Sequence, residues 1–353
     1  MNISELFNPD LLDLMVEQGF VKRADNSEGL YLYNYTDKAQ FGKVWNEVTL
    51  VCRGLITDYE GNIVARPFPK FFNHFESEME LENEVEVTDK IDGSLGILYF
   101  VNKQPFIATR GSFTSKQAVH AGEIYRSRYA EIFKAREGIT YLFEIVYPEN
   151  KIVVDYADTD DLILLGGVVN STGESISAES IGWPGPKVSV YKFKSYAEAL
   201  KAEPRSNAEG LVVRSLRSGQ RIKIKQEEYV RLHLLLSNLS ERRVWESLSS
   251  GSSLEVFLEG APDEYIKWAQ GWKRDLEEKY KTLERDFVDL YLKVKNDLTE
   301  GYSRREFANA VGLIEDAVSR SALFLLEDKK STAELIWWQI KPREHIPLID
   351  IKK

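Results

Sequence analysis

Short apolar runs separated by turn residues dominate the chain from about residue 30 to about residue 225, a pattern typical of antiparallel sheet. Valine and glutamate alternate over residues 84–87, which predicts a half-buried strand that leads to Lys90. Further strands are predicted at residues 95–101, 106–109, 141–146, 152–156, 162–169 and 211–214. Between these strands, residues 117–135 and 196–202 have the apolar spacing of helices.

After about residue 232 the apolar positions follow the period of a helix. Over residues 276–294 they recur at spacings of three and four, which predicts one long amphipathic helix. Ser303 and Glu306 form a capping box that is typical of a helix start. Further helices are predicted at residues 304–314, 322–326 and 335–340.

The length of 353 residues exceeds the size at which a single core keeps growing, so two domains are expected. We predict an α+β protein with a sheet-rich domain at residues 1–238 and an all-α domain at residues 239–353. No apolar run approaches the ~20 residues that cross a bilayer, and the first residues do not resemble a signal peptide. Cys52 is the only cysteine, so the chain can form no intrachain disulfide, which fits a cytoplasmic protein.

The net charge of -10 argues against broad, non-specific binding to nucleic acid, which depends on a basic surface. An enzyme that acts on nucleic acid needs only a local cationic groove. Four basic residues would form one if they converge: Lys70, Arg110, Lys223 and Lys225. The alternative is that these residues are solvated surface charges.

The stretch from Lys90 to Ser94, Lys-Ile-Asp-Gly-Ser, points most directly to chemistry. Lys90 can act as a nucleophile that takes up a nucleoside monophosphate through a phosphoramide bond, because nearby cations favour the unprotonated form of a lysine. Gly93 indicates a tight turn or a close approach of the backbone. The alternative is that Asp92, Gly93 and Ser94 are an ordinary hairpin turn.

Two lysines and two carboxylates further along the chain could serve the same chemistry. Lys223 and Lys225 alternate in a strand-like run, so they point to the same face. Glu144 lies inside an apolar strand, where an unpaired carboxylate would cost roughly several kcal/mol, so it should meet a metal, a ribose hydroxyl or a cation. Glu209 precedes another apolar run. For each carboxylate a simple salt bridge is the alternative.

With these motifs in this order, the chain resembles the covalent nucleotidyltransferases, the superfamily of polynucleotide ligases and RNA capping enzymes. The motifs are Lys90 to Gly93, Phe143-Glu144, Glu209-Gly210 and Lys223-Ile224-Lys225. Within the superfamily the chain is most similar to the RNA ligase 1 family, typified by the enzyme of T-even bacteriophages. The similarity extends to stretches particular to that family: Tyr33-Asn34-Tyr35, Cys52-Arg53-Gly54, Lys70-Phe71-Phe72-Asn73, Arg110-Gly111-Ser112, residues 148–153 and residues 229–233.

The resemblance implies an ATP-grasp-like ligase fold of twisted antiparallel sheets, and it assigns roles to single residues. Lys90 would be the adenylated lysine, and Lys223 and Lys225 would contact the α phosphate. The residues implied to bind ATP are Tyr33, Arg53, Lys70, Lys90, Asp92, Gly93, Arg110, Glu144, Glu209, Lys223 and Lys225. Arg110 stands where the family enzyme has a lysine, which keeps the charge but changes its geometry.

The resemblance also implies a divalent metal, Mg²⁺ or Mn²⁺, as a second cofactor. Glu144 and Glu209 are its expected ligands. Asp263 and Glu264 lie in a stretch that resembles metal-binding acids of the family. For these two residues the alternative is an ordinary helix start, since a proline followed by acids favours one.

We expect an ATP-dependent RNA ligase that joins 5'-phosphate and 3'-hydroxyl ends through lysyl-AMP and RNA-adenylate intermediates, in RNA repair. The family suggests that the helical domain recognises a structured RNA such as a nicked tRNA. One alternative is a DNA ligase or a guanylyltransferase, although those enzymes usually continue into an OB-fold barrel. Another is an inactive nucleotide- or RNA-binding relative. We expect a monomer without membrane attachment, in the cytoplasm, or in the host cytoplasm if the chain is encoded by a phage.

Overall fold

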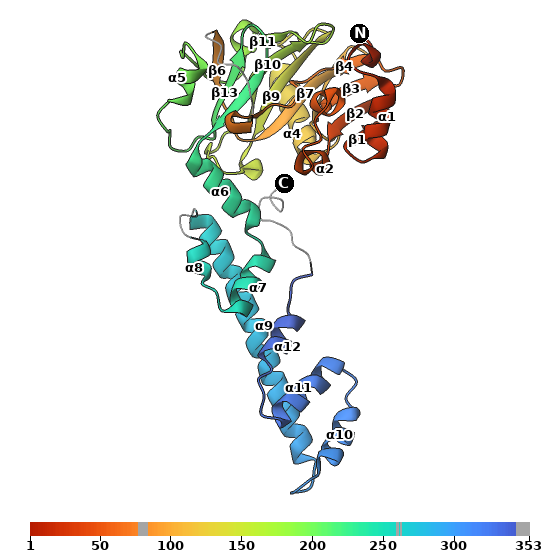
Figure 1. The fold of residues 1–353 in the computed structure, drawn as a ribbon, viewed down its shortest axis with the longest axis vertical. Coiled ribbons are helices and arrows are strands. Elements are labelled where there is room, and N and C mark those ends of the chain that lie inside the picture. Colours follow the sequence, from red (N-terminus) through yellow and green to blue (C-terminus); the bar gives the residue numbers. More distant parts are fainter. Residues whose placement is uncertain (77–83, 259–260, 262, 344–353) are drawn as a thin grey trace. The chain divides into compact units, whose positions relative to one another are not determined.

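The computed structural model describes residues 1–76, 84–258, 261 and 263–343. The chain divides into two compact units, of which the first ends at Arg231 and the second begins at Leu232. All fourteen strands found in the described residues belong to the first unit, and the second unit is helical (Figure 1). The expected α+β organisation, a sheet-rich part followed by a helical part, is therefore confirmed. None of the described helices is long and apolar enough to cross a membrane.

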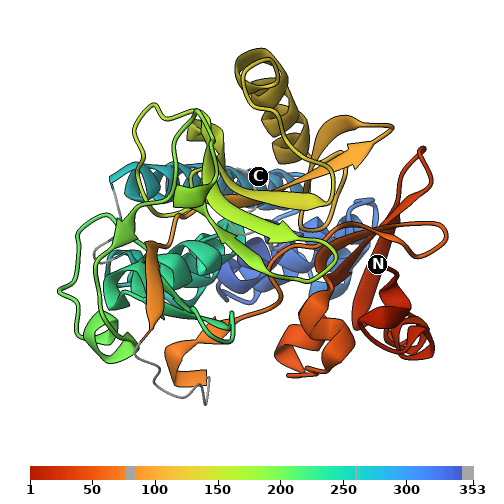
Figure 2. The same ribbon diagram turned by 90° about the horizontal axis from the view of Figure 1, so that it is seen from above.

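Three sheets form the framework of the first unit (Figures 1 and 2). The first sheet has the order β1 (Val21–Asp25), β2 (Leu30–Tyr35), β3 (Arg53–Asp58), β4 (Ile63–Ala65). The second has the order β11 (Ser175–Ser177), β10 (Asp161–Val169), β9 (Ile139–Val146), β7 (Ser94–Val101), β8 (Gln104–Thr109). The third has the order β12 (Val190–Tyr191), β6 (Val85–Asp89), β13 (Gly210–Ser215), β14 (Arg221–Lys225), β5 (Phe72–Asn73). Their neighbouring strands are antiparallel except for the parallel pair of β14 and β5.

Short helices cover these sheets. They are α1 (Pro9–Glu17), α2 (Asp37–Phe41), α3 (Glu47–Val51), α4 (Lys116–Ile124) and α5 (Tyr196–Leu200). The helix predicted at residues 117–135 is shorter than expected, because α4 passes into one wider turn at Tyr125–Tyr129 and then ends. Tyr129 and Phe133 pack there against Trp183, so tertiary packing overrides the helical pattern of the sequence.

Strand β9 lies in the middle of the second sheet and is buried on both faces, which explains its nearly continuous apolar sequence. Phe143 and Ile145 pack on the face that α4 covers, with Ile124 and Tyr125. Leu142 packs on the opposite face, against residues of β2, β3 and β7. Because side chains alternate along a strand, Glu144 shares the face of Leu142 and points away from α4.

Two sequence-based interpretations of this unit are wrong. Residues 152–156 form no strand, although their apolar, β-branched composition favours one. The stretch Asp92-Gly93-Ser94 is no hairpin turn, because β6 and β7 belong to different sheets. Lys90 therefore lies where the chain crosses from the third sheet to the second.

The second unit is built on one long helix (Figure 1). Its helices are α6 (Glu227–Asn238), which begins in the first unit, α7 (Glu241–Ser250), α8 (Leu254–Phe257), α9 (Asp263–Asn296), α10 (Arg304–Gly312), α11 (Ala317–Glu327) and α12 (Ala333–Gln339). The predicted apolar stripe is confirmed, since Phe287 of α9 packs with Ala322 and Ile336. The predicted capping box at Ser303 and Glu306 is also confirmed.

Candidate functional site

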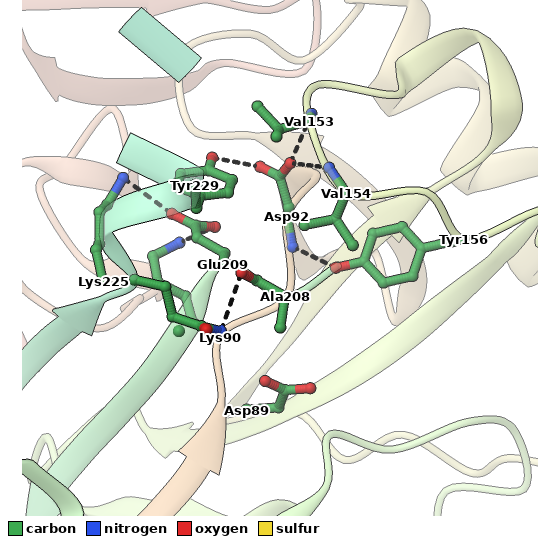
Figure 3. A network of polar contacts seen from close by, with 12 residues as sticks. Asp89, Lys90, Asp92, Val153, Val154, Tyr156, Ala208, Glu209, Lys225 and Tyr229 are labelled. Carbon is green, nitrogen blue, oxygen red and sulfur yellow. Dashed lines mark hydrogen bonds and ion pairs between the residues drawn. The ribbon is translucent and has the colours of Figure 1, made fainter. Parts of the chain in front are cut away.

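Lys90 directly follows the last residue of β6, where this inner strand of the third sheet ends. Its amide donates a hydrogen bond of 3.0 Å to the carbonyl of Gly210, which fixes the backbone of Lys90 against the start of β13. Glu209 immediately precedes β13 and is only 2% exposed. Its carboxylate accepts from Nζ of Lys90 at 2.6 Å and from Nζ of Lys225 at 2.9 Å (Figure 3). The buried carboxylate of Glu209, just before the start of β13, is therefore shared by two lysines.

Two glycines allow this close packing. A Cβ atom on Gly93 would lie 2.7 Å from the carbonyl oxygen of Ile145 and 3.0 Å from Cγ of Glu144. Gly210 has a φ of +147°, and a Cβ atom there would lie 2.0 Å from the carbonyl oxygen of Ile224. The close approach predicted at Gly93 thus exists, and the neighbouring chain is the backbone of β9.

Asp92 holds the irregular segment at residues 152–156 in place. Its carboxylate accepts hydrogen bonds from the amides of Val153 and Val154 at 2.9 and 3.0 Å and from the hydroxyl of Tyr229 at 2.8 Å (Figure 3). Its own amide donates to the hydroxyl of Tyr156 at 2.8 Å. Because these valine amides bond to a carboxylate, they are not available to a strand ladder, which is why the predicted strand does not form.

A pocket of about 500 Å³ opens beside Lys90, between the second and third sheets. Of the residues predicted to bind ATP, those that line the pocket are Arg53, Lys90, Gly93, Arg110, Glu144 and Lys223. Asp92 is 4% exposed and does not line the pocket. The volume is in the range of pockets that hold small molecules of nucleotide size.

The basic side chains of the pocket differ in whether a carboxylate forms an ion pair with them. Arg214 pairs with Glu86 at 2.9 Å, and Arg205, which lies beside the pocket, pairs with Asp89 at 2.8 Å. Over the described ranges, no ion pair to a carboxylate is formed by Arg53, Arg110, Arg221 or Lys223. An anionic ligand would therefore be attracted to these four side chains.

Lys223 shows this lack of compensation most clearly. Burial lowers the pKa of its amine to about 7, and the positive charges of Lys70 and Lys90 contribute to the same effect. Burial also lowers the pKa of Arg53, and the neighbouring charge of Arg110 lowers it further. A phosphate placed beside them would favour the charged form of both groups.

Glu144 is the acidic counterpart of these cations. Burial raises the pKa of its carboxyl group to about 8, although the charge of Lys90 lowers it in part. In the part of the chain that the structure describes, no hydrogen bond or ion pair holds this carboxylate. A half-buried oxygen ligand without a partner is suited to Mg²⁺, which binds one or two carboxylates and completes its shell with water and phosphate oxygens. Among the described residues no group of three or more acidic, histidine or cysteine side chains could hold a metal.

The remaining predicted site residues lie in other positions. Tyr33 is 7% exposed and packs in the core between the first sheet and α3, with Val48 and Leu55. Lys70 is not among the residues that line the pocket, but its positive charge adds to burial in lowering the pKa of Lys223. Lys225 is held by Glu209. Asp263 and Glu264 begin α9, but their side chains lie outside the described residues.

Three residues of this region escaped the sequence analysis. Arg221 lines the pocket, and its guanidinium lies 3.6 Å from the ring centre of Phe68. It alternates with Lys223 and Lys225 along β14, so the period of two already indicated it. Tyr229 and Tyr35, which contact Asp92 and Lys70, stand in stretches that carry the family resemblance, but neither had been given a role.

Comparison with known proteins gives a family match and two curated relatives. A family model described as "RNA ligase", of the T4 RNA ligase 1 type, matches residues 51–229. A "Putative RNA ligase" of Thermovibrio ammonificans is 28% identical over 220 residues, which cover 56% of this chain and 57% of that protein. An RNA ligase of Rhodothermus phage RM378 is 26% identical over 188 residues, which cover 40% of this chain and 41% of that protein. The match thus spans about half the length of these curated relatives.

Solved structures with a similar arrangement are more distant. One titled "Putative ATP-dependent DNA ligase from Aquifex aeolicus" has a TM-score of 0.46 at 14% identity and covers 92% of this chain and 100% of its own. An archaeal ATP-dependent RNA ligase has a TM-score of 0.39 at 15% identity and covers 75% of each chain.

Proposed function

Because the chain belongs to the RNA ligase family typified by T4 RNA ligase 1, we propose that it joins 5'-phosphate and 3'-hydroxyl ends of RNA at the expense of ATP. The observation that supports the proposal is the position of Lys90, a lysine that lines a pocket in which Arg53, Arg110, Arg221 and Lys223 form no ion pair with a carboxylate of the described residues. A lysine nucleophile needs such surroundings, because its attack on ATP expels a highly charged leaving group.

In the first step, Nζ of Lys90 attacks the α phosphorus of ATP. The N–P bond forms while the bond from the α phosphorus to the bridging oxygen breaks, and pyrophosphate leaves. Lys90 must lose a proton for this attack, and the carboxylate of Glu209, 2.6 Å from Nζ, is placed to accept it. Arg53, Arg110 and Lys223 neutralise the triphosphate in this proposal, and the strong burial of Lys223 makes its charge effective.

Glu144 and Glu209 are the proposed ligands of a divalent cation. Mg²⁺ or Mn²⁺ bound there would polarise the phosphoryl group and neutralise its oxygens. The adenylate then passes to the 5'-phosphate of an RNA end, and a 3'-hydroxyl attacks this activated end and expels AMP. Each step is a displacement at phosphorus, which the same cations can assist.

We further propose that residues 1–238 are the adenylyltransferase domain and that residues 239–353 serve RNA specificity, for instance towards a nicked tRNA. The described residues after Leu232 form only helices, without the short strands that an OB-fold barrel requires. This supports an RNA ligase over the DNA ligase and guanylyltransferase alternatives.

Incubation with ATP labelled at the α phosphate, in the presence of Mg²⁺, tests the proposal. We expect a covalent, acid-labile label on Lys90 that is absent from Lys90→Ala. Sealing of ordinary 5'-phosphate ends should be lost in that variant, whereas sealing of a pre-adenylated end should survive in part. An inactive binding relative would acquire no label, and label retained in Lys90→Ala would identify another nucleophile. A comparison of single-stranded RNA with nicked duplex DNA decides the substrate, since sealing of DNA alone would refute the assignment as an RNA ligase.

A further inference from the structure

The ammonium group of Lys70 lies inside a cage of three aromatic rings. Its Nζ is 5.0 Å from the ring centre of Tyr35, 4.8 Å from that of Trp45 and 5.5 Å from that of Phe72. The rings also hold one another edge to face, with centres 5.2 Å apart for Tyr35 and Trp45 and 5.4 Å apart for Trp45 and Phe72. The cage is therefore a packed unit that fixes the end of a long, flexible side chain.

The cage holds Lys70 without a carboxylate partner in the described part of the chain. Among the described residues, the polar partners of Nζ are the hydroxyl of Tyr35 at 3.4 Å and the side-chain oxygen of Gln40 at 3.2 Å, and both are uncharged. Lys90 and Lys225, by contrast, share the carboxylate of Glu209. Aromatic rings attract a cation through their quadrupole and leave its full charge for a ligand, whereas a carboxylate would compete with a phosphate.

The hydroxyl of Tyr35 joins Lys70 to a second cation. Its oxygen accepts from Nζ of Lys70 at 3.4 Å and from Nη1 of Arg110 at 3.2 Å. These donors, together with the neighbouring guanidinium of Arg53, meet the oxygen of the hydroxyl group and leave its hydrogen unused. No acceptor for the hydroxyl hydrogen is found within the described ranges, so this hydrogen is free to bond to an anion that binds between the two cations.

We propose that Trp45 and Tyr35 are positioning residues that make Lys70 and Arg110 one site for the pyrophosphate part of ATP. Trp45 holds the ammonium group through its ring. Tyr35 sets the spacing of the two cations and donates its hydroxyl hydrogen to a phosphate oxygen. The inference rests on the proposed ligase function and extends it, because it assigns these two side chains to the step in which pyrophosphate leaves.

The reverse of adenylation measures directly how tightly the proposed site binds pyrophosphate. Pyrophosphate added to the adenylated protein attacks the phosphorus of lysyl-AMP, breaks the N–P bond and regenerates ATP. The rate of label release against pyrophosphate concentration reports the affinity of the proposed site. Sealing of pre-adenylated RNA involves no pyrophosphate, so it serves as the control for the integrity of the rest of the site.

The variants test the contributions of the Trp45 ring and of the Tyr35 hydroxyl group separately. Trp45→Leu should raise the half-saturating concentration of pyrophosphate about tenfold or more, and Trp45→Phe, which keeps a ring, only about threefold. Tyr35→Phe keeps the ring but loses the hydroxyl, and should raise that concentration about tenfold. The matched control is Phe41→Leu, because Phe41 is 82% exposed on the neighbouring α2 and should leave every value unchanged.

The possible results lead to distinct conclusions. A graded loss of pyrophosphate affinity, with sealing of pre-adenylated RNA within about twofold of the wild type, supports the inference. Unchanged pyrophosphate dependence in Tyr35→Phe and Trp45→Phe refutes it, and so does an equal loss of both activities, which would indicate damage to the fold. If the wild-type protein itself forms no adenylate, the proposed ligase function fails and the inference fails with it.

Discussion

Replacement of Glu144 by glutamine should make the protein more stable while it abolishes adenylation. The carboxyl group lies half-buried on β9 and, as far as the structure describes the chain, has no hydrogen-bond or ion-pair partner. Burial raises its pKa from 4.5 to about 8, so the charged form is disfavoured in the folded protein. Glutamine keeps the shape of the side chain and removes the charge.

The size of the effect follows from the linkage between protonation and folding. A folded-state pKa above the unfolded one means that the folded protein holds the proton more tightly, so its stability falls as the pH rises from 4.5 to about 8. Each pH unit in this window corresponds to about 1.4 kcal/mol, which gives an upper limit of about 5 kcal/mol above pH 8. Below pH 4.5 the carboxyl group is neutral in both states, and Glu144→Gln should match the wild type.

Thermal melting from pH 4.5 to pH 9 measures the difference. We expect the melting temperature of Glu144→Gln to exceed that of the wild type by an amount that grows with pH, by about 2–4 °C for each kcal/mol. If Glu144 binds a metal, Mg²⁺ should raise the melting temperature of the wild type at pH 9 and leave that of the variant unchanged.

The matched control is Glu86→Gln on β6. Glu86 lines the same pocket, but it pairs with Nε of Arg214 at 2.9 Å. Its replacement should destabilise the protein by about 1–3 kcal/mol, because a half-buried guanidinium loses its partner. A Glu144→Gln variant that is less stable than the wild type at pH 8, or whose difference does not depend on pH, would refute the reasoning.

Two further predictions concern the lysine pocket. Because burial lowers the pKa of Lys223 to about 7, this lysine is mostly neutral at pH 8, and a bound phosphate should restore its charged form. ATP binding at pH 8 without metal should therefore take up close to one proton, which calorimetry in buffers of different ionisation enthalpy measures. Equal proton uptake by Lys223→Gln would exclude this lysine as the source. Tyr229→Phe should lose about 1.5–3 kcal/mol of stability and slow adenylation, because the charged carboxylate of Asp92 loses one donor. Tyr196→Phe, at a buried tyrosine that packs beside β13, is the control in denaturant unfolding and should differ little from the wild type.

Part of the site could be predicted from local sequence patterns, because side chains alternate between the two faces of a strand. The alternation at residues 221–225 placed Lys223 and Lys225 on one face, and the structure shows both facing the region of Lys90. The cost of burying a carboxylate predicted that Glu144 meets a metal, a ribose hydroxyl or a cation, but among the described residues no hydrogen bond or ion pair reaches it. For Glu209 the sequence left a salt bridge open beside a ligand role, and the structure shows this carboxylate paired with Lys90 and Lys225.

The parts that sequence analysis missed depend on contacts between distant segments. Asp92-Gly93-Ser94 has the composition of a hairpin turn, yet it connects two sheets, and no local feature distinguishes the two. Residues 152–156 have a strand-like composition, but the amides of Val153 and Val154 donate to the carboxylate of Asp92, which lies 61 and 62 residues earlier in the chain. Tyr33 and Tyr35 are both buried, and their spacing likewise could not reveal that only the hydroxyl of Tyr35 contacts Lys70.

The charges of the pocket belong to two groups, and the difference between them suggests an order of events. Lys90 and Lys225 share one carboxylate, so a phosphate must compete with Glu209 for the charges of these two lysines. Arg53, Arg110 and Lys223 form no such pairs in the described parts of the chain and can bind an anion as they stand. ATP should therefore first meet the uncompensated cations, and its negative charge then favours the movement of Lys225 towards the α phosphate. Glu209 would be left with Lys90 alone, and the carboxylate could then accept the proton that the attacking amine must lose.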